Sequence, residues 1–127
     1  MKRLDKLNEK DLLDERHFPV QALFNELYRE QFLDTLANYI CKGHGFGAEY
    51  GACLFPDDLD DYDIATCGMF EGVEFGLHNG EEILLDYPTF YYYLKKVCDG
   101  YIQDYPQEQE IISSLLNTFK TRYQIKS

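Results

Sequence analysis

Apolar residues recur at helical spacing near both ends of the chain. In the first third they form two runs, Val20–Tyr28 and Phe32–Ile40, which are rotated slightly relative to each other around the helix axis. Pro19 suits the first turn of a helix, and Gly43 suits a helix end. These positions predict a helix from Pro19 onward, either continuous or broken near Arg29.

The middle of the chain has the pattern of strands and turns. Apolar and polar residues alternate over Phe70–Leu77, and the run Ala48–Phe55 favours a strand that enters a turn at Pro56. Asn79-Gly80 is a strong signal for a hairpin turn, after which Glu82–Leu85 returns as the partner strand. This part of the chain therefore predicts a small, mainly antiparallel sheet of about three strands.

Two amphipathic helices are predicted at the C-terminal end. Apolar stripes extend over Phe90–Tyr105 and Ile111–Phe119. Asp86-Tyr87-Pro88 and Asp104-Tyr105-Pro106 precede them, and in each tripeptide the aspartate suits a helix N-cap and the proline a first turn. We expect an α+β fold, in which a helix or broken helix precedes the sheet and the two C-terminal helices pack on one face of it.

The length of 127 residues predicts one domain. Residues 1–17 mix charges of both signs with four leucines. This spacing allows a short amphipathic helix and equally a flexible tail, and the sequence does not decide between them.

The negative charge is concentrated in the middle third. The chain has 23 acidic and 12 basic residues, and the segment 43–88 contains 11 of the acids but no Lys or Arg. The rest of the chain is neutral, since 23 − 11 leaves 12 acids against 12 bases. The centre of this segment is the run Asp57–Asp63, with five aspartates in seven residues.

This charge excludes several classes of partner. Binding to nucleic acid or to an anionic membrane depends on Lys and Arg, and here the charged segment would repel both.

The sequence has no apolar run long enough to span a bilayer, and no apolar signal-peptide core follows the basic N-terminus. Four scattered cysteines, Cys41, Cys53, Cys67 and Cys98, fit reduced thiols better than a disulfide framework. We expect a cytoplasmic protein.

The aspartate run does not match a calcium-binding loop. A loop starting at Asp60 would place Glu71 at position 12, but Tyr62 and Ile64 occupy positions 3 and 5, and Ala65 replaces the turn glycine. A loose carboxylate metal site remains as an alternative hypothesis.

Other catalytic and metal patterns are weak. Cys41 and His44 form the one close pair of zinc-type ligands in the sequence, without the second pair that zinc sites use. His17, His44 and His78 are isolated, with no signature of a nucleophile and its base nearby. We therefore predict no cofactor, no metal and no enzyme activity.

The acidic segment itself is the best candidate for function. Its acids interleave with apolar and aromatic residues, which distinguishes it from a merely solvated surface. Holding like charges together costs folding free energy, so a role in binding a basic protein is expected. The predicted partner-binding residues are Asp57, Asp58, Asp60, Asp61, Tyr62, Asp63, Glu71 and Glu74.

Three segments carry a resemblance to a known family. Phe46-Gly47, Leu54–Asp63 and Phe70–Phe75, followed by the aromatic helix Phe90–Tyr101, resemble CdiI-type immunity proteins of contact-dependent growth inhibition (CDI) systems. The resemblance covers residues 18–120, and Phe-Pro-Asp-Asp and Phe-Glu-Gly-Val-Glu-Phe are its most specific parts.

This resemblance implies a bacterial cytoplasmic protein that neutralises a ribonuclease toxin. The partner would be the nuclease domain at the C-terminal region of a CdiA-type exoprotein, and within this group the resemblance points to the EndoU class. Contact residues differ between cognate pairs, so the resemblance assigns none, and oligomeric state stays open. The alternative is an acidic, carboxylate-rich metal-binding protein or an adaptor for another basic partner.

Overall fold

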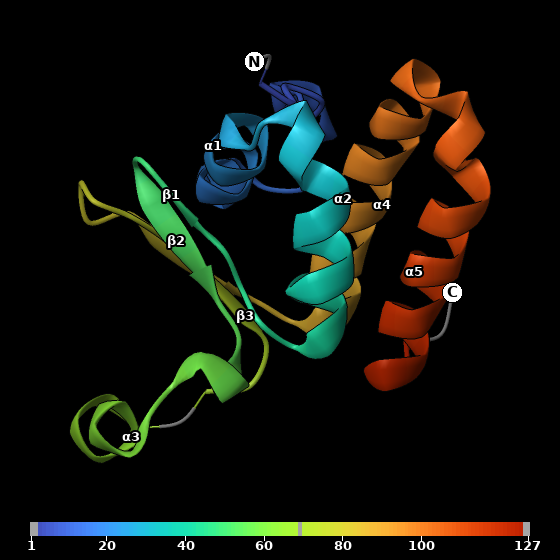
Figure 1. Cartoon of the computed structure of the whole chain (residues 1–127). Coiled ribbons are helices and arrows are strands. Elements are labelled where there is room, and N and C mark those ends of the chain that lie inside the picture. The colour runs from blue at the N-terminus through green and yellow to red at the C-terminus, as the bar shows by residue number, and fades with distance from the viewer. Residues whose placement is uncertain (1–2, 69, 126–127) are drawn as a thin grey trace.

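In the computed structural model, which describes residues 3–68 and 70–125, the N-terminal and C-terminal helices lie on one side of a small antiparallel sheet (Figure 1). The helices are α1 (Phe18–Glu26), α2 (Arg29–Asn38), α3 (Asp61–Cys67), α4 (Tyr87–Asp104) and α5 (Gln109–Arg122). The strands are β1 (Gly47–Ala48), β2 (Gly51–Leu54), β3 (Val73–Leu77) and β4 (Glu82–Leu85). The predicted α+β class is confirmed, with four strands rather than three.

The N-terminal helix is broken, between α1 and α2. Leu27 and Tyr28 both have extended backbones at the break. The amide of Leu4 donates to the carbonyl of Leu27 across 2.6 Å, and Arg3 forms a β-bridge with Tyr28. The described part of segment 1–17 is therefore neither an amphipathic helix nor a free tail. It is an extended chain with two short 3-10 turns, held to the break and anchored by the buried side chains of Leu4 and Leu7.

The four strands follow one another in the order β1-β2-β3-β4, all antiparallel. The run Ala48–Phe55 contains a tight turn at Glu49-Tyr50, so it forms the β1–β2 hairpin instead of the single strand expected. Strand β3 starts at Val73, three residues later than expected. Gly72 precedes it with φ +114°, and a Cβ atom there would lie 2.3 Å from the carbonyl oxygen of Leu85.

The two faces of the sheet differ in what covers them. Phe75 on β3 and its cross-strand partners Cys53 and Ile83 face the helices, and α1 packs directly against β2 and β3. On the opposite face, Leu54, Glu74 and Leu84 lie side by side across β2, β3 and β4. In the described part of the chain no helix covers this outer face (Figure 1).

A chain of phenylalanines joins the sheet to the C-terminal helices. The ring of Phe90 on α4 lies 5.8 Å from that of Phe75, 5.6 Å from that of Phe55 and 5.4 Å from that of Phe119 on α5. All four side chains are fully buried. Both C-terminal helices therefore lie on the same side of the sheet, with α4 contacting it and α5 packed behind α4.

The two Asp-Tyr-Pro tripeptides have different roles. Asp86 caps α4 as expected, accepting a hydrogen bond from the amide of Thr89 at 2.8 Å. Asp104 caps no helix, because α4 continues through it, and it pairs instead with Lys6 at 2.9 Å and Arg29 at 3.4 Å. The predicted N-cap role of Asp104 was therefore wrong, whereas Pro106 does stand in the first turn of the short 3-10 helix that leads into α5.

We expect Asp86→Ala to lower the free energy of unfolding at neutral pH by about 1 kcal/mol, the usual value of an N-cap. Hydrogen bonding to Thr89 holds the pKa of Asp86 below its usual value of 3.8. The stabilisation is therefore complete above pH 3.8 and is lost as the pH falls through the lowered pKa. Urea unfolding at several pH values measures both effects. Asp86→Asn, which keeps an acceptor, is the control, and an equal loss in both variants would argue against capping.

Candidate functional site

The acidic run forms an arm that leaves the sheet and returns to it. We define the arm as residues 56–72, which connect β2 to β3. These strands pair at Leu54 and Glu74, so the two ends of the arm lie next to each other. Phe55 and Val73 are buried in the core, whereas no described side chain between them belongs to it. Helix α3, near the tip, projects away from both the sheet and the helices (Figure 1).

Asp58 holds the root of the arm. Its Oδ2 accepts hydrogen bonds from the amides of Gly45 and Phe55, both at 2.8 Å, and its Oδ1 lies 3.0 Å from Nδ1 of His44. The Asp58 side chain is only 19% exposed. This predicted contact residue thus points back into the protein, where it fastens the start of the arm to the loop after α2.

Asp60 and Asp63 start helix α3. Asp60 Oδ1 accepts the amide of Asp63 at 2.8 Å, and Asp63 Oδ2 accepts the amide of Asp60 at 3.3 Å. This reciprocal arrangement is a capping box, in which each carboxylate satisfies a backbone donor at the first turn of the helix. A helix was not predicted here, although the Asp-x-x-Asp spacing is the signal that could have revealed it.

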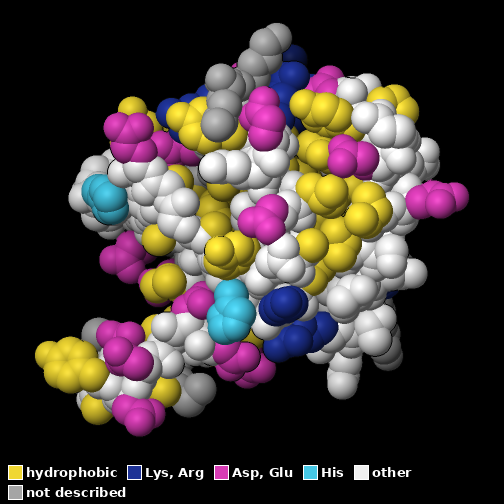
Figure 2. Space-filling model, viewed as in Figure 1, with side chains coloured by type: hydrophobic (Ala, Val, Ile, Leu, Met, Phe, Trp, Pro, Cys, Tyr) yellow, Lys and Arg dark blue, Asp and Glu magenta, His cyan; other side chains and the backbone are white. Residues whose placement is uncertain are grey.

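Four further residues of the arm point into solvent. Asp57, Asp61 and Glu71 are exposed, and Tyr62 is 75% exposed. Figure 2 shows acidic and hydrophobic side chains side by side on the projecting arm. Aromatic rings are enriched at protein-binding surfaces, and the carboxylates beside this one would suit a basic partner.

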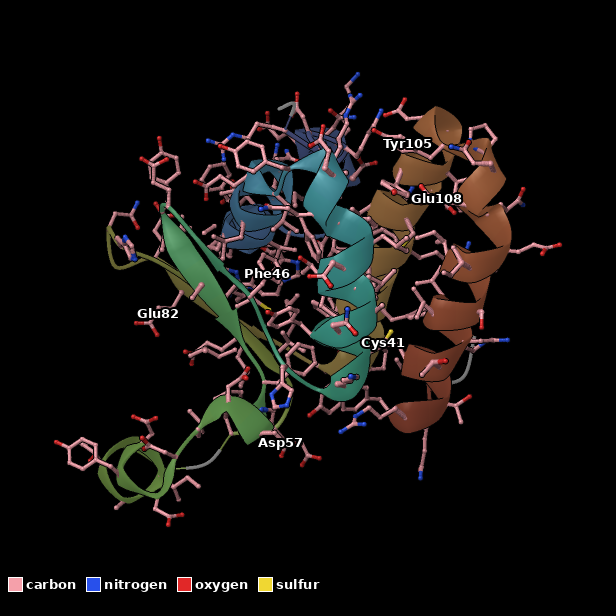
Figure 3. All side chains as sticks on the ribbon, in the orientation of Figure 1. Cys41, Phe46, Asp57, Glu82, Tyr105 and Glu108 are labelled. Carbon is pink, nitrogen blue, oxygen red and sulfur yellow. The ribbon has the colours of Figure 1, made fainter. Side chains whose placement is uncertain are left out.

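One basic residue approaches the arm from elsewhere in the chain. Arg122 on α5 lies 3.8 Å from Asp57, which stands at the root of the arm (Figure 3). The sequence had suggested that the segment has no basic neighbour, and the fold corrects this for Asp57. The pair is solvent-exposed, so it contributes little to stability.

A groove of about 350 Å³ runs between the arm and the end of the sheet. Its apolar lining comes from Leu54, Leu59 and Phe70, and its acidic lining from Asp58, Asp63 and Glu74. Partial burial, together with the nearby Glu82 carboxylate, raises the pKa of Glu74 above its usual value. The groove therefore combines an apolar floor with three partly buried carboxylates.

We expect Glu74→Gln to raise the melting temperature at neutral pH. The titratable groups around Glu74 are the carboxyls of Glu82 on β4, Asp63 on α3 and Asp58, all of one sign. Because the folded-state pKa is raised, the wild type loses stability as the pH rises from 4.5 through that pKa, whereas the variant does not titrate there. Thermal melts of both proteins across this range test the effect. A variant less stable than the wild type at neutral pH would contradict it.

The described residues offer little for metal or nucleophile chemistry. No group of three or more His, Cys, Asp or Glu side chains among them is placed to hold a metal ion. Cys41, Cys53 and Cys98 are free and buried, and burial raises the pKa of each thiol, that of Cys41 to about 11. The side chain of Cys67 lies outside the described ones. None of the described helices has the length and apolar character to cross a bilayer.

The eight predicted residues thus occupy one region with distinct placements. Asp57, Asp61, Tyr62 and Glu71 face solvent, Asp58 turns inward, and Glu74 lines the groove. Sequence reasoning missed the contribution of β4. The alternation in Glu82–Leu85, which puts Glu82 and Leu84 on one face, was the available signal.

Most of the chain matches a known protein family. Residues 10–116 match the model of a family described as CDI immunity protein, which covers the sheet, the arm and most of the helices. No curated protein matches the chain.

Proposed function

Because this chain belongs to the CDI immunity protein family, we propose that it binds a basic ribonuclease toxin domain and blocks its access to RNA. Proteins of this family bind a cognate CdiA toxin, and they are inhibitors, not enzymes. Beyond membership of the family, we propose that the toxin is a ribonuclease, that the acidic arm contacts it, and that inhibition takes place in the cytoplasm.

The unbalanced charge of the projecting arm is the observation that carries this proposal. Segment 43–88 holds 11 acids and no Lys or Arg, and from outside this segment Arg122 of α5 approaches the arm at Asp57. A ribonuclease must bind phosphates, so its RNA site is basic. Carboxylates on a projecting arm can occupy such a site in place of phosphates, and complementary charge speeds the encounter.

In this mechanism the arm inhibits by occlusion, and no covalent bond is made or broken. Asp57, Asp61 and Glu71 would pair with Lys or Arg of the toxin, and Tyr62 would supply an aromatic anchor. Asp60 and Asp63 contribute charge while they cap α3, and Asp58 acts as a positioning residue for the arm. Glu74 extends the acidic surface into the groove.

The experiment uses the C-terminal domain of the cognate CdiA-type exoprotein, which is to be sought in the gene immediately upstream. We expect the purified protein to bind that domain, to prevent it from degrading RNA in vitro and to protect cells that express it. The association rate should fall steeply with added salt, as expected for steering by charge. A toxin domain that is inhibited but does not cleave RNA would overturn the ribonuclease assignment. Binding without inhibition would instead favour an adaptor.

A further inference from the structure

The outer face of the sheet lies next to the arm, and no helix of the described residues covers it. Leu54, Glu74 and Leu84 lie side by side on it, and Leu84 is 48% exposed. Glu82, two residues from Leu84, is on the same face and points away from the helices (Figure 3). Leu84 is not part of the buried core, and its significance comes from the larger surface that it shares with Leu54 and the two glutamates.

This face continues into the groove beneath the arm. Leu54 and Glu74 belong to both, because they form the last cross-strand pair of β2 and β3 and also line the groove. Leu59 and Phe70 of the arm extend the apolar floor on the other side. The result is one continuous surface from β4 to the arm, with apolar residues along its middle and carboxylates beside them.

The charges on this surface determine which partner fits. Glu74 and Glu82 are close enough for Glu82 to raise the pKa of Glu74, and segment 43–88 contains no Lys or Arg to neutralise them. A second copy of this chain related by two-fold symmetry would place the same carboxylates opposite one another. A surface with Lys or Arg around an apolar centre would instead neutralise both acids and cover the leucines.

We propose that the outer face of β2, β3 and β4 forms one docking surface with the arm, and that it receives an apolar, Lys- or Arg-edged patch of the toxin domain. This inference rests on the proposed function and extends it. The arm supplies exposed charge, whereas the sheet supplies the apolar contact, with Leu84 and Glu74 central to it. Interfaces owe most of their affinity to such central, desolvated residues, while exposed charges at the rim mainly affect rate.

The test compares matched variants on two surfaces. Leu84→Lys and Glu74→Gln change the outer sheet face, while Ile111→Lys and Glu110→Gln make the same changes on α5. Ile111 is exposed to the same extent as Leu84, 48%, and Glu110 is exposed. Affinity for the upstream-encoded toxin domain is measured by calorimetry, folding by thermal melting, and oligomeric state by light scattering.

We expect Leu84→Lys to weaken binding by more than ~10-fold and Glu74→Gln by about 5-fold, with both α5 variants within about 2-fold of the wild type. Glu74→Gln is informative because its melting temperature should be higher than that of the wild type while its affinity for the toxin domain is lower. A variant that bound less tightly because it was partly unfolded would have a lower melting temperature. Equal affinities for all four variants would overturn the inference while the proposed function stands. A wild type that does not bind the toxin domain would overturn both. A dimer that Leu84→Lys converts to a monomer would show that a second copy covers this face, which also overturns it.

Discussion

Replacing Asp57, Asp61 and Glu71 together with lysine is expected to weaken toxin binding by at least ~100-fold and to abolish protection of cells. These side chains are exposed, and none of them belongs to the buried core. The substitution reverses the charge of the arm but keeps Asp58, Asp60 and Asp63, which hold its conformation. The affinity and the association rate, each measured at several salt concentrations, check the result, and the salt dependence of the rate should largely disappear.

The control reverses the same number of charges elsewhere. Glu15, Glu30 and Asp99 are also exposed, and they lie outside segment 43–88, on the turn before α1, on α2 and on α4. A triple lysine variant at these positions changes the net charge of the protein equally. Similar affinity losses in the two triple variants would mean that net charge alone attracts the toxin, and the arm would then have no special role.

Replacing Asp58 with alanine is expected to be the most destabilising single change in the acidic run. The amides of Gly45 and Phe55 would lose their acceptor, and His44 would lose its partner. A partly buried donor left without an acceptor costs about 1–3 kcal/mol, so two of them predict a total loss of about 2–6 kcal/mol. Urea unfolding followed by circular dichroism measures this loss.

The neighbouring residue provides the matched control. Asp57 carries the same side chain but is 69% exposed and lies 3.8 Å from Arg122. Its replacement by alanine should change the free energy of unfolding by less than about 0.5 kcal/mol. Asp58→Asn keeps one acceptor oxygen and should fall between the two alanine variants. If Asp57→Ala and Asp58→Ala were equally stable, the inward hydrogen bonds of Asp58 would make no measurable contribution to the free energy of unfolding.

Periodicity in the sequence predicted most of the scaffold. Helices α1, α2, α4 and α5 follow the apolar stripes, and the Asn79-Gly80 turn joins β3 to β4 as expected. These features depend on local side-chain spacing and on turn residues, so a short stretch of sequence is enough to predict them. The eight predicted site residues also converge on one region, because they are close together in the sequence.

What could not be predicted depends on contacts between distant residues. Asp58 looks like its neighbours in the sequence, and only the fold brings the amide of Gly45 to its carboxylate. Asp104 resembles Asp86 in its tripeptide, but Lys6 and Arg29 bind it. In both cases identical local chemistry has different outcomes, since the partner comes from a segment that a local pattern does not include.

The position of the arm between two paired strands has a consequence for how such proteins diversify. The arm starts after Leu54 and ends before Glu74, which are cross-strand partners, so it amounts to a long excursion within a β-hairpin. Lengthening a loop whose ends are already fixed costs little, only about 0.6 kcal/mol for each doubling. Its length and sequence can therefore change while the phenylalanine core stays the same. On the function proposed above, a change of toxin specificity within this excursion would need no new fold.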